Sequence, residues 1–270
     1  MINSKEAPLW MWVLRLIGGL FIFIILDGIA QLPGTFFKSP VPIIIGSIVL
    51  SALILLAYYG WIGLTEGQRA TDLPIRRLLP ETCKGLLTGV VYFIIVVGIM
   101  MLIGVYRITS FDFDGLTQLA QFCFFLTIAV GEEVMFRGIL FRMIDMRWNT
   151  WLALIVSTLV FGFVHIVNPG ATWWSAIAIA LESGLLLGAA YKYSGTLWLP
   201  IGIHWAWNYT QGNVFGFAVS GNDFGVSIIT PHIEGHELLT GGIFGAEASI
   251  IAVVVGVLFA CYYIKKLCLK

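Results

Sequence analysis

The sequence has little charge for its length. Only 11% of the 270 residues are Asp, Glu, Lys or Arg, whereas soluble domains carry roughly 25%. Hydrophobic residues make up 59%, and the mean hydropathy is +0.93. This composition excludes an ordinary soluble domain, and the many apolar runs predict an integral membrane protein.

Several other signals are absent. Lys and Arg together number 15, as do Asp and Glu, so no global charge indicates a nucleic-acid partner. The four cysteines form no CxxC pair, and we interpret them as reduced structural thiols rather than metal ligands or redox groups. "MINSKEAP" leads into an apolar run without a small-residue cleavage site, so we expect the first helix to be retained.

Apolar stretches long enough, or nearly so, to cross a bilayer recur along the whole chain. At 1.5 Å per residue, a hydrocarbon layer of ~30 Å needs about 20 helical residues. We therefore predict an all-α integral membrane protein, a bundle of about eight transmembrane helices. The expected spans are Leu9–Ile29, Val41–Leu64, Gly85–Ile108, Leu116–Phe136, Trp151–Val167, Trp173–Tyr193, Leu197–Phe217 and Ala248–Leu267.

The basic residues predict the orientation. With a cytoplasmic N-terminus, every Lys and Arg except Lys38 and Arg107 falls on the cytoplasmic side. This bias predicts an even number of crossings with both termini cytoplasmic. The last outer segment, about residues 218–247, is Gly-rich and acidic, and we expect a loose cap over the outer face.

The stretch "GEEVMFRG" places two adjacent carboxylates directly after an apolar run. Glu133 and Arg137 are spaced i, i+4 with the acid first, the favourable order for an ion pair. Glu132 points about 100° away on the helix, which leaves it free to take a proton. Alternatively, all three are headgroup-level charges at a helix end.

Two histidines lie in later apolar runs. His165 follows Phe161 by one turn, and His204 precedes Asn208 by one turn. Either histidine alone could be a hydrogen-bonded structural residue. A turn near Asn149 would bring Glu132 and His165 to nearly the same depth, and either Asn149 or Thr150 could cap the next helix.

His204 lies close to the start of its own span. It reaches the depth of Glu132 and His165 in one of two ways. Either the preceding hairpin projects into the cytoplasm, or the helix of His204 starts deep in the protein, at Pro200.

At these residues the sequence resembles the CPBP family of intramembrane proteases, which includes CAAX prenyl endopeptidases and bacteriocin-processing or immunity proteins. The family pattern is EExxxR, FxxxH and HxxxN or HxxxD on successive core helices. The corresponding stretches are "EEVMFR" from Glu132 to Arg137, "FGFVH" from Phe161 to His165 and "HWAWN" from His204 to Asn208. The resemblance covers about residues 116–213.

The resemblance implies three parts of the chain: residues 1–115 with helices one to three, a catalytic core at 116–213, and residues 214–270 with the outer loop and the last helix. It implies peptide-bond hydrolysis within the membrane. Glu132 and His165 would activate a water, while His204 and Asn208 would stabilise the oxyanion. Glu133, Arg137 and Phe161 would orient these groups.

A zinc ion is an open alternative. The resemblance allows Glu132, His165 and His204 to be three ligands of a catalytic Zn²⁺, as in a metalloprotease, with one position left for water. There is no HExxH motif. The residues leave both a glutamate-type protease and a metalloprotease open.

Three functions fit the pattern. The first is an intramembrane endopeptidase of the cell membrane that acts on a prenylated C-terminus, a leader peptide or another membrane-associated peptide. The second is a non-catalytic regulatory or bacteriocin-immunity protein on the same scaffold. The third is a transporter with a proton relay, which no inverted repeat supports. The expected partners are a peptide or protein substrate and the lipid bilayer, with no nucleic acid and no assignment of oligomeric state.

Overall fold

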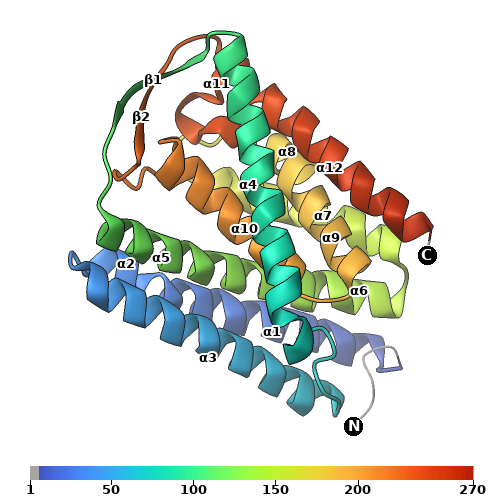
Figure 1. Ribbon diagram of the computed structural model, residues 1–270. Coiled ribbons are helices and arrows are strands. Elements are labelled where there is room, and N and C mark those ends of the chain that lie inside the picture. The colour runs from blue at the N-terminus through green and yellow to red at the C-terminus, as the bar shows by residue number, and fades with distance from the viewer. Residues whose placement is uncertain (1–5, 270) are drawn as a thin grey trace.

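Long apolar runs become long helices because each backbone polar group must find its partner within the helix when water is absent. The computed structural model describes residues 6–269, and it is a bundle of tilted helices with one pair of strands at an end (Figure 1). In this range, seven helical segments are long and apolar enough to cross a membrane. They are Leu9–Phe36, Pro40–Glu66, Ile75–Leu102, Gly115–Arg147, Thr150–Val167, Trp173–Ser194 and Ile250–Cys268.

Most of these segments consist of consecutive helical elements. The helices are α1 (Leu9–Ala30), α2 (Leu32–Phe36), α3 (Pro40–Glu66), η1 (Ile75–Arg77), α4 (Leu78–Leu102), α5 (Gly115–Glu133), η2 (Val134–Phe141), α6 (Arg142–Arg147), α7 (Thr150–Val164), η3 (His165–Val167), α8 (Trp173–Ile179), η4 (Ala180–Gly184), α9 (Leu185–Ser194), α10 (Trp198–Tyr209), η5 (Thr210–Val214), α11 (Glu237–Thr240), η6 (Gly242–Phe244), η7 (Ala246–Ala248) and α12 (Ile250–Cys268).

One expected span is shorter than the sequence suggests. The run Leu197–Phe217 forms α10, of 12 residues, followed by the five-residue η5. The turn before α10 is already buried, since Leu197 is fully covered and its N–H donates to the carbonyl of Asp72. The helix therefore starts inside the protein, at Trp198, and Pro200 lies in its first turn.

A second difference lies at the end of the third expected span. Helix α4 ends at Leu102, and Gly104 follows with a φ of +79° that a side chain would disfavour. The polar residues beyond it form strand β1 (Tyr106–Phe111), which pairs antiparallel with β2 (Ile229–Ile233). The prediction of helix as far as Ile108 was therefore wrong.

The segment between α10 and α12 is packed rather than loose. It carries β2 and the short helices α11, η6 and η7. Phe217, Phe244 and Glu247 are buried in it. The expectation of a loose cap was wrong because the apolar residues between its glycines reach the same hydrophobic cluster as the helices.

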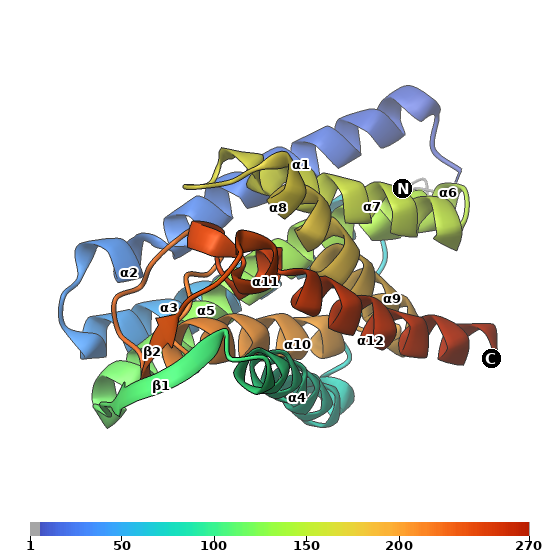
Figure 2. The ribbon, with the colours of Figure 1, turned by 90° about the horizontal axis from the view of Figure 1, so that it is seen from above.

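Close backbone contacts hold α4 against α10. A Cβ on Gly85 would lie 2.4 Å from the carbonyl oxygen of Leu199, and one on Gly202 would lie 2.5 Å from that of Thr82. Small residues that let two helices approach are the usual means of association in lipid. This contact places α10 in the interior, and from above it lies with α5 between α1 and α4 (Figure 2).

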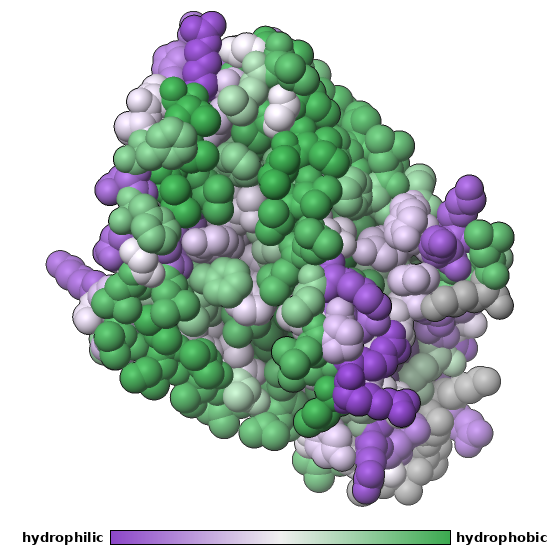
Figure 3. All heavy atoms as spheres, in the orientation of Figure 1, coloured by the Kyte–Doolittle hydropathy of each residue, from purple (hydrophilic) through white to green (hydrophobic). Residues whose placement is uncertain are grey.

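The outer surface of the bundle is apolar. Large hydrophobic side chains such as Phe21, Leu56 and Leu87 are more than half exposed on α1, α3 and α4. Apolar residues cover broad areas between polar edges (Figure 3). Helix α1 begins and α12 ends at the same end of the bundle (Figure 1). These are the features of a multi-pass helical membrane protein.

Candidate active site

The two adjacent glutamates differ in exposure. Both stand at the end of α5, directly before η2, which is a π-helix. The side chain of Glu132 is 19% exposed, and that of Glu133 is 0% exposed. Only Glu132 can therefore meet a water or a substrate without a rearrangement.

Glu133 forms the predicted ion pair with Arg137. The guanidinium Nη1 donates to Glu133 Oε1 at 2.9 Å, and both side chains are fully buried. Nη2 donates to the carbonyl of Gly184 at 3.2 Å, and the guanidinium carbon lies 4.4 Å from the centre of the Phe161 ring. Arg137 thus ties three elements together, so the alternative of headgroup-level charges is wrong for this pair.

Glu133 also fixes the ring of His204. Nδ1 of His204 lies 2.9 Å from Glu133 Oε1, which already accepts from Arg137. A carboxylate oxygen only accepts, so Nδ1 carries the proton of this bond. Nε2 then faces Glu132, with 3.9 Å to its Oε2. This separation exceeds a direct hydrogen bond and leaves room for a bridging atom.

His165 is oriented by its own helix. It follows the last turn of α7 and its Nδ1 lies 2.7 Å from the carbonyl oxygen of Phe161. The carbonyl can only accept, so Nδ1 carries the proton and Nε2 keeps its lone pair. The Phe161 ring centre lies 5.0 Å from that of His165 and 6.0 Å from that of His204. Phe161 therefore packs against both imidazoles.

The predicted cap at Asn149 is confirmed. Its side chain accepts from the N–H of Leu152 and starts α7. The chain reverses at this point, and α7 then packs against η2. The reversal brings η2, which directly follows Glu133, alongside α7, which directly precedes His165.

Asn208 lies one turn after His204 in α10 and is buried. The structure shows no hydrogen bond between its side-chain amide and any other residue in the range 6–269. An amide N–H₂ group is a neutral donor, so Asn208 can offer a hydrogen bond on the same face of α10 as His204.

One acidic residue of the site was missed in the sequence. Asp27 lies in the last turn of α1, outside the three motifs. It is buried, and it lies close enough to Glu132 and His204 to interact electrostatically with both. Gly131 makes this possible, because a Cβ there would lie within 2 Å of Asp27 Oδ1. The available signal was an Asp within a long apolar run.

Glu182 does not join this group. It is fully buried in η4, and the hydroxyl of Tyr92 donates to its Oε2 at 2.7 Å. The carboxyl group of Glu247 lies close enough to interact with it electrostatically. Glu182 is therefore a buried, hydrogen-bonded residue outside the group of motif residues.

The described residues do not fit a three-ligand metal site as they stand. Between residues 6 and 269, no three His, Cys, Asp or Glu side chains are grouped so that they could hold an ion. Glu132 and His204 face each other, whereas the polar contact that the described residues show for His165 is with the carbonyl of Phe161.

Comparison with known families matches part of this chain. Residues 115–210 match the family described as "Type II CAAX prenyl endopeptidase Rce1-like". The matched part contains all three motifs and confirms the resemblance to CPBP intramembrane proteases. Searches of curated proteins and of solved structures gave no match.

Proposed function

We propose that this protein is an intramembrane endopeptidase that cleaves a peptide bond of a membrane-associated or lipidated substrate. One observation carries the proposal. A single partly exposed carboxylate, Glu132, faces the free nitrogen of a histidine whose other nitrogen is fixed by a buried ion pair. The family match over the same elements supports protease activity.

The proposed reaction begins with water. Glu132 accepts a proton as the water oxygen attacks the peptide carbonyl carbon, and the Nε2 lone pair of His165 holds the other water hydrogen. Glu132 Oε2 is buried without a hydrogen-bond partner in the described residues, so it has an unused acceptor. General-base assistance of this kind contributes typically ~10²–10⁴-fold.

The negative charge then develops on the former carbonyl oxygen. Asn208 and Nε2–H of His204 donate to that oxygen in this proposal. With Nδ1 already protonated, a proton on Nε2 makes the ring of His204 an imidazolium, and the carboxylate of Glu133 beside Nδ1 offsets part of its charge. When the C–N bond breaks, Glu132 returns its proton to the leaving amine.

The substrate class follows from the family match and the membrane setting. We propose a substrate with a C-terminus anchored by a prenyl group, since the matched family is described by that activity. We further propose that the protein lies in the cell membrane with both termini cytoplasmic. Helix α1 begins and α12 ends at the same end of the bundle, which supports an even number of crossings (Figure 1).

Cleavage by the purified full-length protein tests the proposal. Farnesylated and unlipidated forms of one fluorogenic peptide are incubated with wild type and with Glu132→Ala in detergent, with and without a chelator. We expect cleavage of the farnesylated peptide by wild type alone, unchanged by the chelator. Loss of activity with the chelator and recovery with Zn²⁺ would instead establish the metalloprotease alternative. No cleavage by wild type of any peptide in a broad library would favour the regulatory or immunity alternative.

A further inference from the structure

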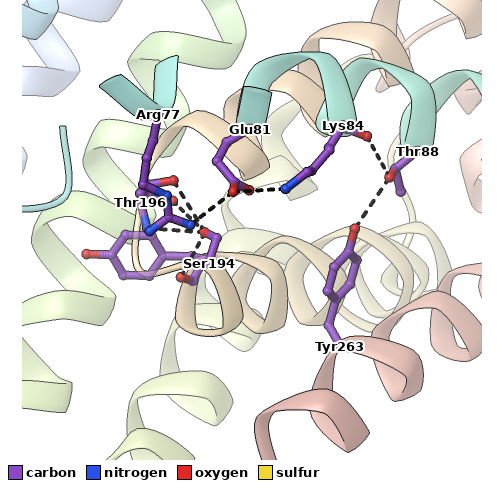
Figure 4. A network of polar contacts seen from close by, with 8 residues as sticks. Arg77, Glu81, Lys84, Thr88, Ser194, Thr196 and Tyr263 are labelled. Atoms are coloured by element: carbon purple, nitrogen blue, oxygen red, sulfur yellow. Dashed lines mark hydrogen bonds and ion pairs between the residues drawn. The ribbon is translucent and has the colours of Figure 1, made fainter. Parts of the chain in front are cut away.

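A polar cavity lies away from the motif residues, at the end of the bundle where α4 begins and where α9 and α12 end. It encloses about 380 Å³, and none of the motif residues lines it. Figure 4 shows most of the polar side chains around it. They come from η1, α4, α9 and α12 and include Arg77, Glu81, Lys84, Thr88, Tyr193 and Tyr263.

The cavity contains more cations than anions. Glu81 Oε1 accepts from Arg77 at 3.0 Å and from Lys84 at 3.3 Å. Glu81 is its only carboxylate and is 9% exposed, whereas the side chains of Arg77 and Lys84 are 39% and 66% exposed. One negative charge thus faces two positive charges. A guanidinium has five N–H donors and an ammonium three, so both cations retain donors for a further acceptor.

Hydroxyl groups and an apolar wall complete the cavity. The hydroxyls of Tyr263 and Thr88 lie 3.4 Å apart on its polar side (Figure 4). Leu87, also on the wall, is 65% exposed on the lipid-facing surface of α4. Lys266 lies 5.8 Å from the ring centre of Tyr262 at the end of α12. The cavity therefore spans the boundary between the apolar belt and the polar end of the bundle.

We propose that this cavity binds the headgroup phosphate of an anionic phospholipid. A phosphodiester offers acceptor oxygens without donors, which matches the remaining donors of Arg77 and Lys84. The apolar wall at Leu87 accommodates the beginning of an acyl chain. A zwitterionic headgroup would bring its own cation to a site that already carries excess positive charge, so the site discriminates in favour of lipids with a net negative headgroup.

Binding is tested by lipid titration of the full-length protein in detergent micelles. Dioleoylphosphatidylglycerol or dioleoylphosphatidylcholine is added, and the midpoint of thermal unfolding is followed. The triple variant Arg77→Gln/Glu81→Gln/Lys84→Gln removes both cations. It also removes the carboxylate of Glu81, which would otherwise be left without a positively charged partner. Lys265→Gln is the matched control, because it makes the same change in net charge at the same end of α12 and does not line the cavity.

We expect a saturable rise in the midpoint with phosphatidylglycerol, larger than with phosphatidylcholine, in wild type and in Lys265→Gln. The triple variant should need at least ~10-fold more phosphatidylglycerol, since each cation near an anionic lipid contributes about 1 kcal/mol. If the triple variant does not fold, Lys84→Gln replaces it, because Arg77 still pairs with Glu81.

An equal response of the triple variant and wild type would overturn the proposal, as would an equal response to the two lipids. Glycerol 3-phosphate distinguishes the source of the phosphate. It should produce no shift at the lipid concentrations used, and a shift equal to that of the lipid would assign the site to a soluble phosphate compound instead.

Discussion

At the scale of single residues, the two adjacent glutamates have different surroundings. Glu133 is fully buried and shares one oxygen between Arg137 and His204. Glu132 is partly exposed, and its Oε2 has no hydrogen-bond partner in the described residues. The difference follows from helix geometry, because neighbouring residues point about 100° apart. Glu133 is therefore suited to hold Arg137 and His204 in place, and Glu132 is suited to accept a proton.

This division predicts opposite behaviour for two conservative changes. Glu132→Gln should lower the cleavage rate at least ~10²-fold and leave thermal unfolding nearly unchanged, since it removes a base and keeps the shape. Glu133→Gln should lower stability by ~3–5 kcal/mol, because Arg137 is left without its counter-charge. Cleavage rate and unfolding of both variants in detergent provide the measurement.

The control for this pair is Glu133→Gln combined with Arg137→Met. It removes both buried charges and should recover part of the lost stability without restoring full activity. A fully active Glu132→Gln protein together with a stable, inactive Glu133→Gln protein would show that the two roles are reversed.

At the scale of elements, the contact of α1 with α5 brings Asp27 to the site. The contact depends on the absence of a side chain at Gly131, where a Cβ would lie within 2 Å of Asp27 Oδ1. Helix α1 otherwise presents mainly apolar side chains to its surroundings. A helix outside the three motifs thus supplies a carboxylate beside Glu132.

We predict that Gly131→Ala destabilises the protein by ~1–3 kcal/mol, the usual range for overpacking, and also lowers activity. Gly98→Ala in α4 is the matched control, because nothing lies within 4 Å of a Cβ there. It should be neutral or slightly stabilising, since alanine favours helix. Equal unfolding midpoints for the two variants would show that α1 can move away without cost.

The packed cap between α10 and α12 contains a buried acid of its own. Burial raises the pKa of Glu247 to about 7, while hydrogen bonds from Ser220, Gln211 and Trp207 act in the opposite direction. The folded protein therefore holds this proton at a pH where the unfolded chain, with an ordinary Glu near 4.5, has lost it. The contribution of Glu247 to the free energy of unfolding falls as the pH rises from about 4.5 to about 7, and it does not change further above pH 7.

Glu247→Gln should remove this part of the pH dependence. A difference of about 2.5 pKa units corresponds to roughly 3 kcal/mol, so the variant should be more stable than wild type at pH 8 and similar at pH 4.5. Thermal unfolding across this pH range in detergent measures the effect. Parallel stability curves for the two proteins would show that Glu247 does not titrate in this range.

At the scale of the whole molecule, the two ends of the bundle differ in charge. The loops and helix ends near the start of α4 and the end of α12 carry Arg76, Arg77, Lys265 and Lys266. The opposite end carries β1, β2 and the packed cap, with Glu234 in an exposed position. By the positive-inside rule, we propose that the first end is the cytoplasmic one.

Cysteine accessibility in intact cells tests this orientation. In a variant without the four native cysteines, Glu234→Cys should react with a membrane-impermeant maleimide from outside. Arg76→Cys and Lys266→Cys should react only after the membrane is permeabilised. Outside labelling at position 76 or 266 would reverse the proposed topology.

The sequence determined the class of structure and the residues to examine. Apolar length alone predicted most spans, because helix formation in lipid depends on local hydrogen bonds and local composition. The i, i+4 spacing predicted the ion pair of Glu133 with Arg137, and a local cap at Asn149 predicted the start of α7. Each of these features depends on residues that are close in sequence.

Only the tertiary structure decided the features that join distant parts of the chain. The approach of Asp27 to Glu132, the bond from Glu133 to His204 and the deep start of α10 depend on how helices pack. The pairing of β1 with β2 depends on a partner more than 100 residues away. The physical reason is that packing and strand pairing are contacts between elements, whereas hydropathy and helix spacing are properties of one element alone.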